Sequence, residues 1–150
     1  MIRSRNRMWI CASLMVLNVA FIWVNSLLPS QMSSAFSRFV GSILNFILPG
    51  PDIPPTGGGH GTLRKIAHIT EFACLGVLLS WCFRMMRQKK WEFILWPVAV
   101  GMLVGAIDET IQCFVPGRGP RVFDVCIDTA GVLLGVLVFA AILRRRKQKK

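Results

Sequence analysis

Four apolar blocks, each about as long as a membrane-spanning helix, constrain the fold of this chain more than any other feature. A hydrocarbon core about 30 Å thick needs roughly 20 apolar residues in helical form. Because that core holds no water to satisfy backbone groups, helices are the viable spanning form for such blocks. The sequence therefore predicts an all-α, four-span transmembrane bundle in a single domain over residues 1–150. The predicted spans are Met8 to Leu28, Lys65 to Phe83, Trp91 to Phe114 and Val122 to Leu143.

The first block follows Arg3, Arg5 and Arg7 and contains no charged residue. A basic segment before an apolar stretch is also typical of a secretory signal peptide. The apolar part of a signal peptide usually has about 7–15 residues, however, and this block is longer and precedes no clear small-x-small cleavage site. We therefore predict an uncleaved membrane anchor.

The basic residues predict how the bundle is oriented. The net charge is +11, and 13 of the 18 basic residues lie before the first block, between the second and third blocks, or after the fourth. The positive-inside rule makes that side cytoplasmic, which predicts a multi-pass plasma-membrane protein with both termini in the cytoplasm. Because the charge flanks the spans, it favours contact with the bilayer and its anionic headgroups and argues against a nucleic-acid-binding face.

Residues 29–64 form the one long connection, which this orientation places outside the cell. The apolar side chains of residues 36–48 fall mostly on one side of a helical wheel, as is typical of an interfacial or re-entrant helix. A loop that packs on the bundle is the alternative. The Pro- and Gly-rich residues 49–59 then end any helix.

Two pairs of glycines predict close helix packing. Gly101 and Gly105 in the third block, and Gly131 and Gly135 in the fourth, both follow the pattern G-x-x-x-G. Small residues one turn apart let helix backbones approach closely. We therefore expect the third and fourth spans to pack against each other.

The five cysteines lie in apolar stretches and include no C-x-x-C pair. We predict that they pack as small hydrophobic side chains. Cys113 and Cys126 both lie near the predicted outer face, and a disulfide between these two is the alternative.

The acidic residues are placed where a membrane protein can least accommodate them. Of the seven acids, five lie near the ends of the spans that the orientation places outside: Glu71, Asp108, Glu109, Asp124 and Asp128. Charged groups at membrane depth are costly, so they usually face a bundle interior and mark function. We predict one outward-facing polar pocket. Its candidate residues are Lys65, His68, Glu71, Asp108, Glu109, Gln112, Arg118, Arg121, Asp124 and Asp128.

Three interpretations of this pocket remain open. The basic residues could simply neutralise the acids and lock the helix ends together. Arginine forks also suit phosphate or carboxylate groups, which would make the pocket a binding site for an anionic lipid or a lipid-linked cell-wall precursor. Finally, His68 and Glu71 at i, i+3, with carboxylates from two other helices, could hold a divalent ion, although a single histidine argues against zinc. The sequence by itself assigns no metal and no cofactor.

Catalysis is possible on the same residues. His68 together with Glu71 or Asp108 could act as general acid and base, and Glu109 completes the candidate catalytic set. No nucleophile is evident, so the sequence leaves open whether the protein is an enzyme.

Two stretches of the chain resemble the VanZ-like family of small bacterial integral membrane proteins. Residues 64–76, with Lys65, His68 and Glu71, are similar to the family pattern Lys-x-x-His-x-x-Glu-aromatic-x-x-Leu-Gly. Residues 108–131 are similar to its Asp-Glu-x-x-Gln, Pro-x-Arg and Asp-x-x-x-Asn-x-x-Gly patterns. The chain departs from the family in having Asp128 where the family usually has Asn and Phe72 where it usually has Tyr.

The resemblance implies a role at the cell envelope. The founding member of the family is associated with low-level resistance to teicoplanin, a glycopeptide that targets cell-wall precursors. Our leading hypothesis is a membrane protein that binds a lipid-linked or glycopeptide ligand in its outward pocket and modulates susceptibility to teicoplanin-type glycopeptides. The alternatives are a membrane-embedded enzyme acting on a cell-wall or lipid substrate, and a scaffold whose polar network only holds the helices together.

Overall fold

The computed structural model describes residues 2–29, 59–86, 91–119 and 121–148. The predicted all-helical fold is confirmed, because these residues form helices and contain no strand. The predicted interfacial or re-entrant helix over residues 36–48 lies outside the described residues. The helices are α1 (Ile2–Leu27), α3 (Gly59–Met85), α4 (Glu92–Gln112) and α5 (Val122–Gln148).

Each helix contains a stretch long and apolar enough to cross a membrane, which confirms the four predicted spans. The shortest of these stretches have 21 residues, or about 31 Å of helix at 1.5 Å per residue, which matches a hydrocarbon core. The helices α1 and α3 begin earlier than predicted, at Ile2 and Gly59. A helix need not stop where its apolar stretch stops, because it can continue into the headgroup region.

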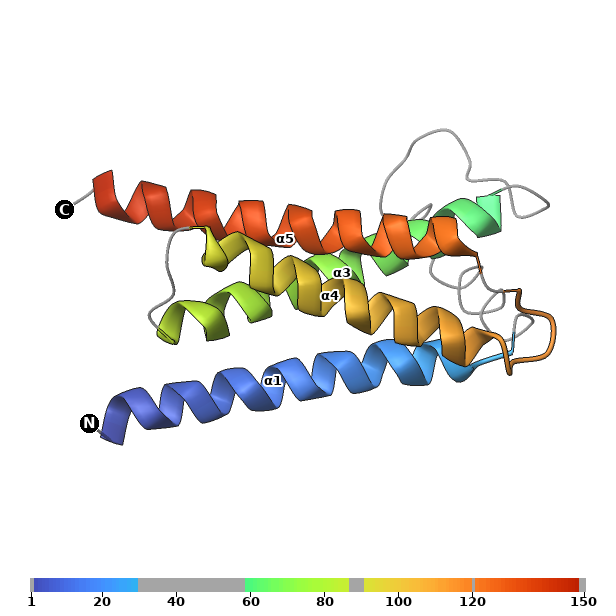
Figure 1. Ribbon diagram of the computed structural model, residues 1–150, viewed down its shortest axis with the longest axis horizontal. Coiled ribbons are helices and arrows are strands. Elements are labelled where there is room, and N and C mark those ends of the chain that lie inside the picture. Colours follow the sequence, from blue (N-terminus) through green and yellow to red (C-terminus); the bar gives the residue numbers. More distant parts are fainter. Residues whose placement is uncertain (1, 30–58, 87–90, 120, 149–150) are drawn as a thin grey trace, which may run out of the picture.

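The chain runs along the bundle four times, so both termini lie at the same end (Figure 1). The opposite end carries the C-terminus of α1, the start of α3 and the link between α4 and α5. We call this opposite end the site end. That the site end faces outward and the termini face the cytoplasm stays a prediction from the basic residues.

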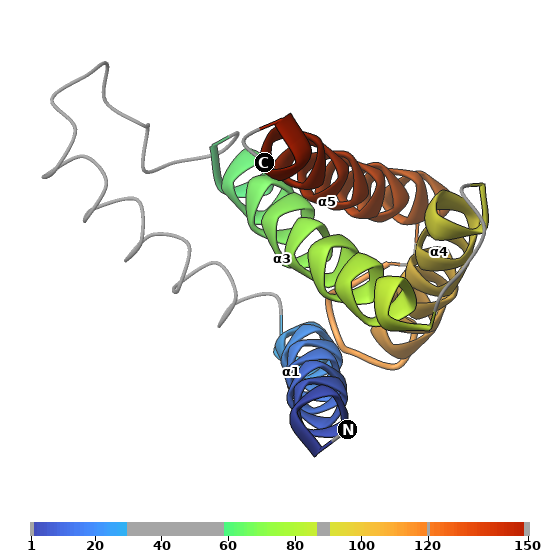
Figure 2. The same cartoon turned by 90° about the vertical axis from the view of Figure 1, so that its left-hand side faces the viewer.

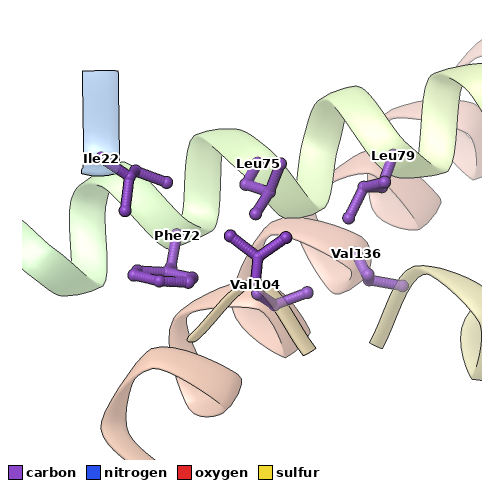
Figure 3. Close-up of a cluster of buried hydrophobic side chains, with 7 residues drawn as sticks. Ile22, Phe72, Leu75, Leu79, Val104 and Val136 are labelled. Carbon is purple, nitrogen blue, oxygen red and sulfur yellow. The ribbon is translucent and has the colours of Figure 1, made fainter. Parts of the chain in front are cut away.

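Helices α3, α4 and α5 pack on one another, and α1 packs on α3 and α4 (Figure 2). Lipid tails are as apolar as these side chains, so the core stabilises the bundle mainly through close packing. Figure 3 shows Leu75 of α3 and Val104 of α4 pointing toward each other in this core. Its buried members are Ile22, Phe72, Leu75, Leu79, Val104, Val132 and Val136.

The predicted packing of the third span on the fourth is confirmed, but only the glycines of α4 lie at that contact. Helix α4 does pack on α5, and a Cβ on Gly101 would lie 2.5 Å from a methyl carbon of Val132. The other pair faces α3 instead: a Cβ on Gly131 would lie 2.8 Å from the carbonyl oxygen of Ile69, and one on Gly135 would overlap the α3 backbone. A G-x-x-x-G pattern marks a helix face that allows close approach, but it does not name the partner.

One prediction about the cysteines is wrong. Cys11 of α1 and Cys82 of α3 form a disulfide, with Cα atoms 6.0 Å apart, within the usual range for such a bond. Cys74, Cys113 and Cys126 are free, so the alternative pairing of Cys113 with Cys126 is also absent. The bonded residues are 71 positions apart, and only the packing of α1 on α3 brings them within bonding distance.

Candidate functional site

Three helices bring His68, Asp108 and Asp128 together inside the bundle near its site end. One nitrogen or oxygen atom from each side chain lies within 4.8 Å of the others. The His68 Nδ1 atom is 3.5 Å from Asp128 Oδ1. The two carboxylates are almost completely buried, with exposed fractions of 0% for Asp108 and 1% for Asp128. Ionisable groups buried at this depth in a membrane protein are costly and usually serve function.

Gln112 connects this cluster to its neighbours. The side-chain amide of Gln112 donates to Asp108 Oδ2 at 2.9 Å and to Glu109 Oε1 at 3.1 Å. It also lies 3.4 Å from the hydroxyl of Ser26 on α1. Gln112 sits one turn beyond Asp108 on α4, so the helix itself places the amide beside the carboxylate. The amide therefore orients two acids and ties α4 to α1.

Helix α1 supplies polar groups that the sequence analysis did not assign to the site. The Asn25 amide donates to Glu71 Oε1 at 2.9 Å, and Ser26 is fully buried beside Gln112. The available signal was a pair of adjacent polar residues near the end of the first span, shortly before Pro29. Polar side chains of that kind inside a bundle commonly bond across to another helix.

The link between α4 and α5 contacts the C-terminus of α1 at the site end. The Arg118 guanidinium donates to the carbonyl oxygens of Ser26 at 3.0 Å and Asn25 at 3.3 Å. These carbonyls belong to the last turn of α1, beyond the reach of the regular helical ladder, where the helix dipole favours a cation. The Asn25 carbonyl also accepts the backbone N–H of Leu28 at 3.3 Å. The backbone N–H of Arg121 donates to Glu109 Oε2 at 2.9 Å. Arg118 thus acts as a cap for α1.

Two buried oxygens of the cluster, and one of the neighbouring Glu71, have no hydrogen-bond donor within the part of the chain that the structure describes. They are Oδ1 of Asp108, Oδ2 of Asp128 and Oε2 of Glu71. Leaving a buried acceptor unsatisfied costs about 1–3 kcal/mol, and more for a charged group. Such atoms in a folded protein call for a partner, either a proton, a water molecule or a bound ligand.

A pocket of about 200 Å³ opens beside the cluster at the site end. Exposed Lys65 and Arg121 stand at its rim, and Lys65 Nζ lies 5.9 Å from the centre of the Phe123 ring. Half-buried Glu71 and buried Asp108 and Gln112 belong to the hydrogen-bonded network but do not line the pocket. The predicted residues that line it are Lys65, His68, Glu109, Arg118, Arg121, Asp124 and Asp128.

An apolar groove of about 380 Å³ lies between α1, α3 and α4. It begins about one helical turn deeper than the cluster, because Leu75 follows Glu71 on α3 and Val104 precedes Asp108 on α4. Within a membrane, a surface of this kind suits a hydrocarbon chain. Its lining includes Met15, Val19, Trp23, Leu75, Leu79 and Val104.

The residues of this site fall within a segment that matches a known protein family. A family model described as VanZ/LLP1 matches residues 9–144 of the chain, nearly its whole length. The protein belongs to this family. No curated protein and no solved structure matches the chain. The VanZ-like residues noted in the sequence therefore include His68 and Asp108 of the buried cluster and Gln112, which orients Asp108.

Asp128, where the chain departs from the family pattern, lies beside His68 in the structure. Asp128 is the side chain that pairs with His68, and the catalytic partners considered from sequence were Glu71 and Asp108 instead. Glu71 is engaged by Asn25. An asparagine in place of Asp128 could accept a hydrogen bond from the imidazole, but it would carry no charge to balance a protonated histidine.

Proposed function

We propose that this VanZ-family membrane protein binds a lipid-linked, phosphate-bearing molecule of the cell envelope in the pocket at its site end. Through that binding it modulates susceptibility to teicoplanin-type glycopeptides. The observation that carries the proposal is the chemistry of the pocket lining. It combines two exposed cations, Lys65 and Arg121, with buried hydrogen-bond acceptors such as Asp128. Cations recognise phosphate, and carboxylates accept hydrogen bonds from sugar hydroxyls or amides.

The size of the pocket limits what it can enclose. Its volume of about 200 Å³ is below the roughly 300–1,000 Å³ typical of pockets that surround a drug-sized ligand. A phosphate-bearing headgroup suits this space, whereas a glycopeptide antibiotic is far too large to be enclosed. We therefore favour the lipid-linked ligand over direct binding of the glycopeptide.

The membrane setting supports a ligand with a hydrocarbon tail. The pocket lies at one end of four spans, so a lipid headgroup can reach it from the bilayer surface. The apolar groove lined by Trp23, Leu75 and Val104 offers a separate surface for part of a chain. The predicted orientation places this end outside the cytoplasm, where glycopeptides meet cell-wall precursors.

The proposal is tested by comparing three probes on the purified full-length protein in lipid nanodiscs. Farnesyl diphosphate carries both chain and phosphate, farnesol carries only the chain, and inorganic pyrophosphate carries only the headgroup. We expect farnesyl diphosphate to bind at least about tenfold more tightly than either partial probe, a difference of about 1.4 kcal/mol. Native mass spectrometry or calorimetry measures the affinities.

Variants of the pocket rim complete this test. The double substitution Lys65→Gln with Arg121→Gln should weaken farnesyl diphosphate binding by about tenfold or more. Arg145→Gln is the control, because Arg145 is an exposed cation in the last turn of α5, at the opposite end of that helix from Asp124 and Asp128. Equal affinity for farnesyl diphosphate and farnesol, or equal losses in rim and control variants, would refute the proposal.

A second candidate function is an enzyme acting on the same class of lipid. The contact between His68 and Asp128 favours it, because a carboxylate that orients an imidazole is a common feature of general acid–base sites. An enzyme of this kind would hydrolyse farnesyl diphosphate: water attacks the terminal phosphorus, the bond to the bridging oxygen breaks, and the products are inorganic phosphate and farnesyl phosphate. His68→Asn would abolish this phosphate release while protein stability holds. Binding without any release would support the binding function alone.

A further inference from the structure

We propose that His68, Asp108 and Asp128 form a binding site for a divalent metal ion beneath the pocket. Each of the three residues comes from a different helix, and their ligand atoms lie within 4.8 Å of one another. Imidazole nitrogen and carboxylate oxygen are the common ligands of divalent metals in proteins. Carboxylates and histidines projecting inward from facing helices are a recurrent way to build a metal site inside a helical bundle.

Two buried oxygens give an independent reason to expect a ligand at this place. Asp108 Oδ1 and Asp128 Oδ2 have no hydrogen-bond donor among the described residues, although the two side chains are only 0% and 1% exposed. The other oxygen of Asp108 is held by Gln112. A metal ligand whose second atom is fixed by a neighbouring donor is the usual arrangement around a metal ion. Gln112 therefore orients Asp108 toward the cluster while leaving one oxygen to coordinate.

The packing of α4 leaves room for the site. A Cβ on Gly105 would lie 3.3 Å from the Cβ atom of Asp128 and 3.6 Å from its Oδ2 atom. A side chain larger than hydrogen would therefore crowd this carboxylate. Because glycine is present, α4 carries Asp108 close to α5 without covering the unpartnered oxygen of Asp128.

The donor set of one imidazole and two carboxylates favours a cation that accepts both nitrogen and oxygen ligands, such as Mn²⁺, over Ca²⁺, which prefers oxygen alone. Metal–ligand distances of about 2.0–2.2 Å place two ligands of one ion roughly 3–4 Å apart. The observed spacing of up to 4.8 Å closes to this value with side-chain movements of about 1 Å. Three protein ligands leave further coordination positions for water or for a ligand oxygen.

A cation here would also explain how a pocket with an acidic floor accepts a phosphate group. His68 and Asp128 line the pocket, so a metal ion between them would present positive charge to its contents. This step rests on the proposed function, because it assumes that the ligand is anionic. The metal site itself does not depend on that assumption.

The experiment is a titration of the full-length protein in detergent with MnCl₂, after removal of bound metals by EDTA. Electron paramagnetic resonance counts the free Mn²⁺, and we expect one bound ion per chain. Asp108→Asn and Asp128→Asn should each weaken binding by at least about tenfold. Glu92→Gln is the control: it removes an acidic charge in the first turn of α4, at the opposite end of that helix from Asp108, and should change the affinity by less than about threefold.

A second measurement needs no variant and so does not depend on whether one folds. Pulsed electron paramagnetic resonance of wild-type protein with Mn²⁺ should show coupling to a nitrogen nucleus, which only coordination by an imidazole such as His68 would produce among the proposed ligands. Added Zn²⁺ should displace the Mn²⁺. Absence of stoichiometric Mn²⁺, absence of nitrogen coupling, or undiminished binding in Asp108→Asn would overturn the metal site.

Failure of this proposal is distinguishable from failure of the proposed function. Farnesyl diphosphate that binds equally well with and without EDTA, in a protein that takes up no Mn²⁺, would overturn the metal site and leave the lipid-binding function intact. Stoichiometric Mn²⁺ binding without affinity for farnesyl diphosphate would support the metal site and overturn the ligand. Farnesyl diphosphate binding that requires Mn²⁺ would support both.

Discussion

Replacing Gly135 by alanine should force α3 and α5 apart. The added Cβ would overlap the carbonyl oxygen of Ala73 and lie 3.0 Å from the amide nitrogen of Val77. Both are backbone atoms of α3, so no change of side-chain rotamer relieves the overlap. Alanine gains up to about 1 kcal/mol over glycine inside a helix, but overpacking costs about 1–3 kcal/mol and sometimes more. Because the overlap is with backbone, we expect a net loss of about 2 kcal/mol in the free energy of unfolding.

Substitutions of two other glycines give the stability changes with which Gly135→Ala is compared. A Cβ on Gly119 meets nothing within 4 Å, so Gly119→Ala should change stability by less than about 0.5 kcal/mol. A Cβ on Gly101 meets methyl groups of Val132, which can rotate away, so its cost should be intermediate. Denaturant-induced unfolding in detergent micelles, followed by far-ultraviolet circular dichroism, ranks the three variants against the wild type.

The same substitution should weaken the metal site. Gly135 lies two turns from Asp128 on α5, and the contact of α5 with α3 holds His68 at 3.5 Å from Asp128. Moving the helices apart would lengthen this distance, so Mn²⁺ affinity should fall together with stability. If Gly135→Ala proves as stable as Gly119→Ala, α3 and α5 are not in close backbone contact and this reasoning is wrong.

Two further substitutions test how α1 is attached to the rest of the bundle. Arg118→Ala removes the hydrogen bonds to the carbonyls of Asn25 and Ser26 and should lower the free energy of unfolding by about 1–3 kcal/mol. The same denaturant titration measures this loss. An unchanged midpoint of the unfolding transition would contradict the capping role. Cys11→Ser removes the disulfide to Cys82 and should cost about 2–4 kcal/mol. Reductant should impose the same loss on the wild type but none on Cys11→Ser, and thiol alkylation with mass spectrometry checks the bond directly; a wild type indifferent to reductant would count against it.

The number of spans and the acids that lie together in the candidate site were predictable from the chain alone, whereas Asn25 and Ser26 were not. Apolar blocks of sufficient length must become helices in a membrane, because the backbone has no other way to satisfy its polar groups there. The rarity of acids in such blocks likewise singles out Glu71, Asp108 and Asp128. The disulfide between Cys11 and Cys82 was not predictable, because it depends on a contact between helices far apart in the sequence.

The roles of individual polar residues also required the tertiary structure. The sequence motif predicted that Arg118 binds phosphate, but in the folded chain its guanidinium donates hydrogen bonds to the last carbonyls of α1. Asn25 and Ser26 showed no functional pattern, yet they complete the hydrogen bonds of Glu71 and Gln112. A pattern identifies a polar side chain that needs a partner, and only the packing selects which partner it meets.

The sequence by itself determined that this chain has four helices able to cross a membrane and that five of its seven acids lie near the same end of them, because burial in lipid depends on composition and length. Only the tertiary structure decided that His68 lies beside Asp128 and Asp108. Likewise, only the tertiary structure decided that the glycines of α5 pack against α3 instead of α4. The physical reason is that helix period and hydropathy describe one helix at a time. Distances between side chains of different helices depend on the rotation and spacing of the helices, which close packing alone sets.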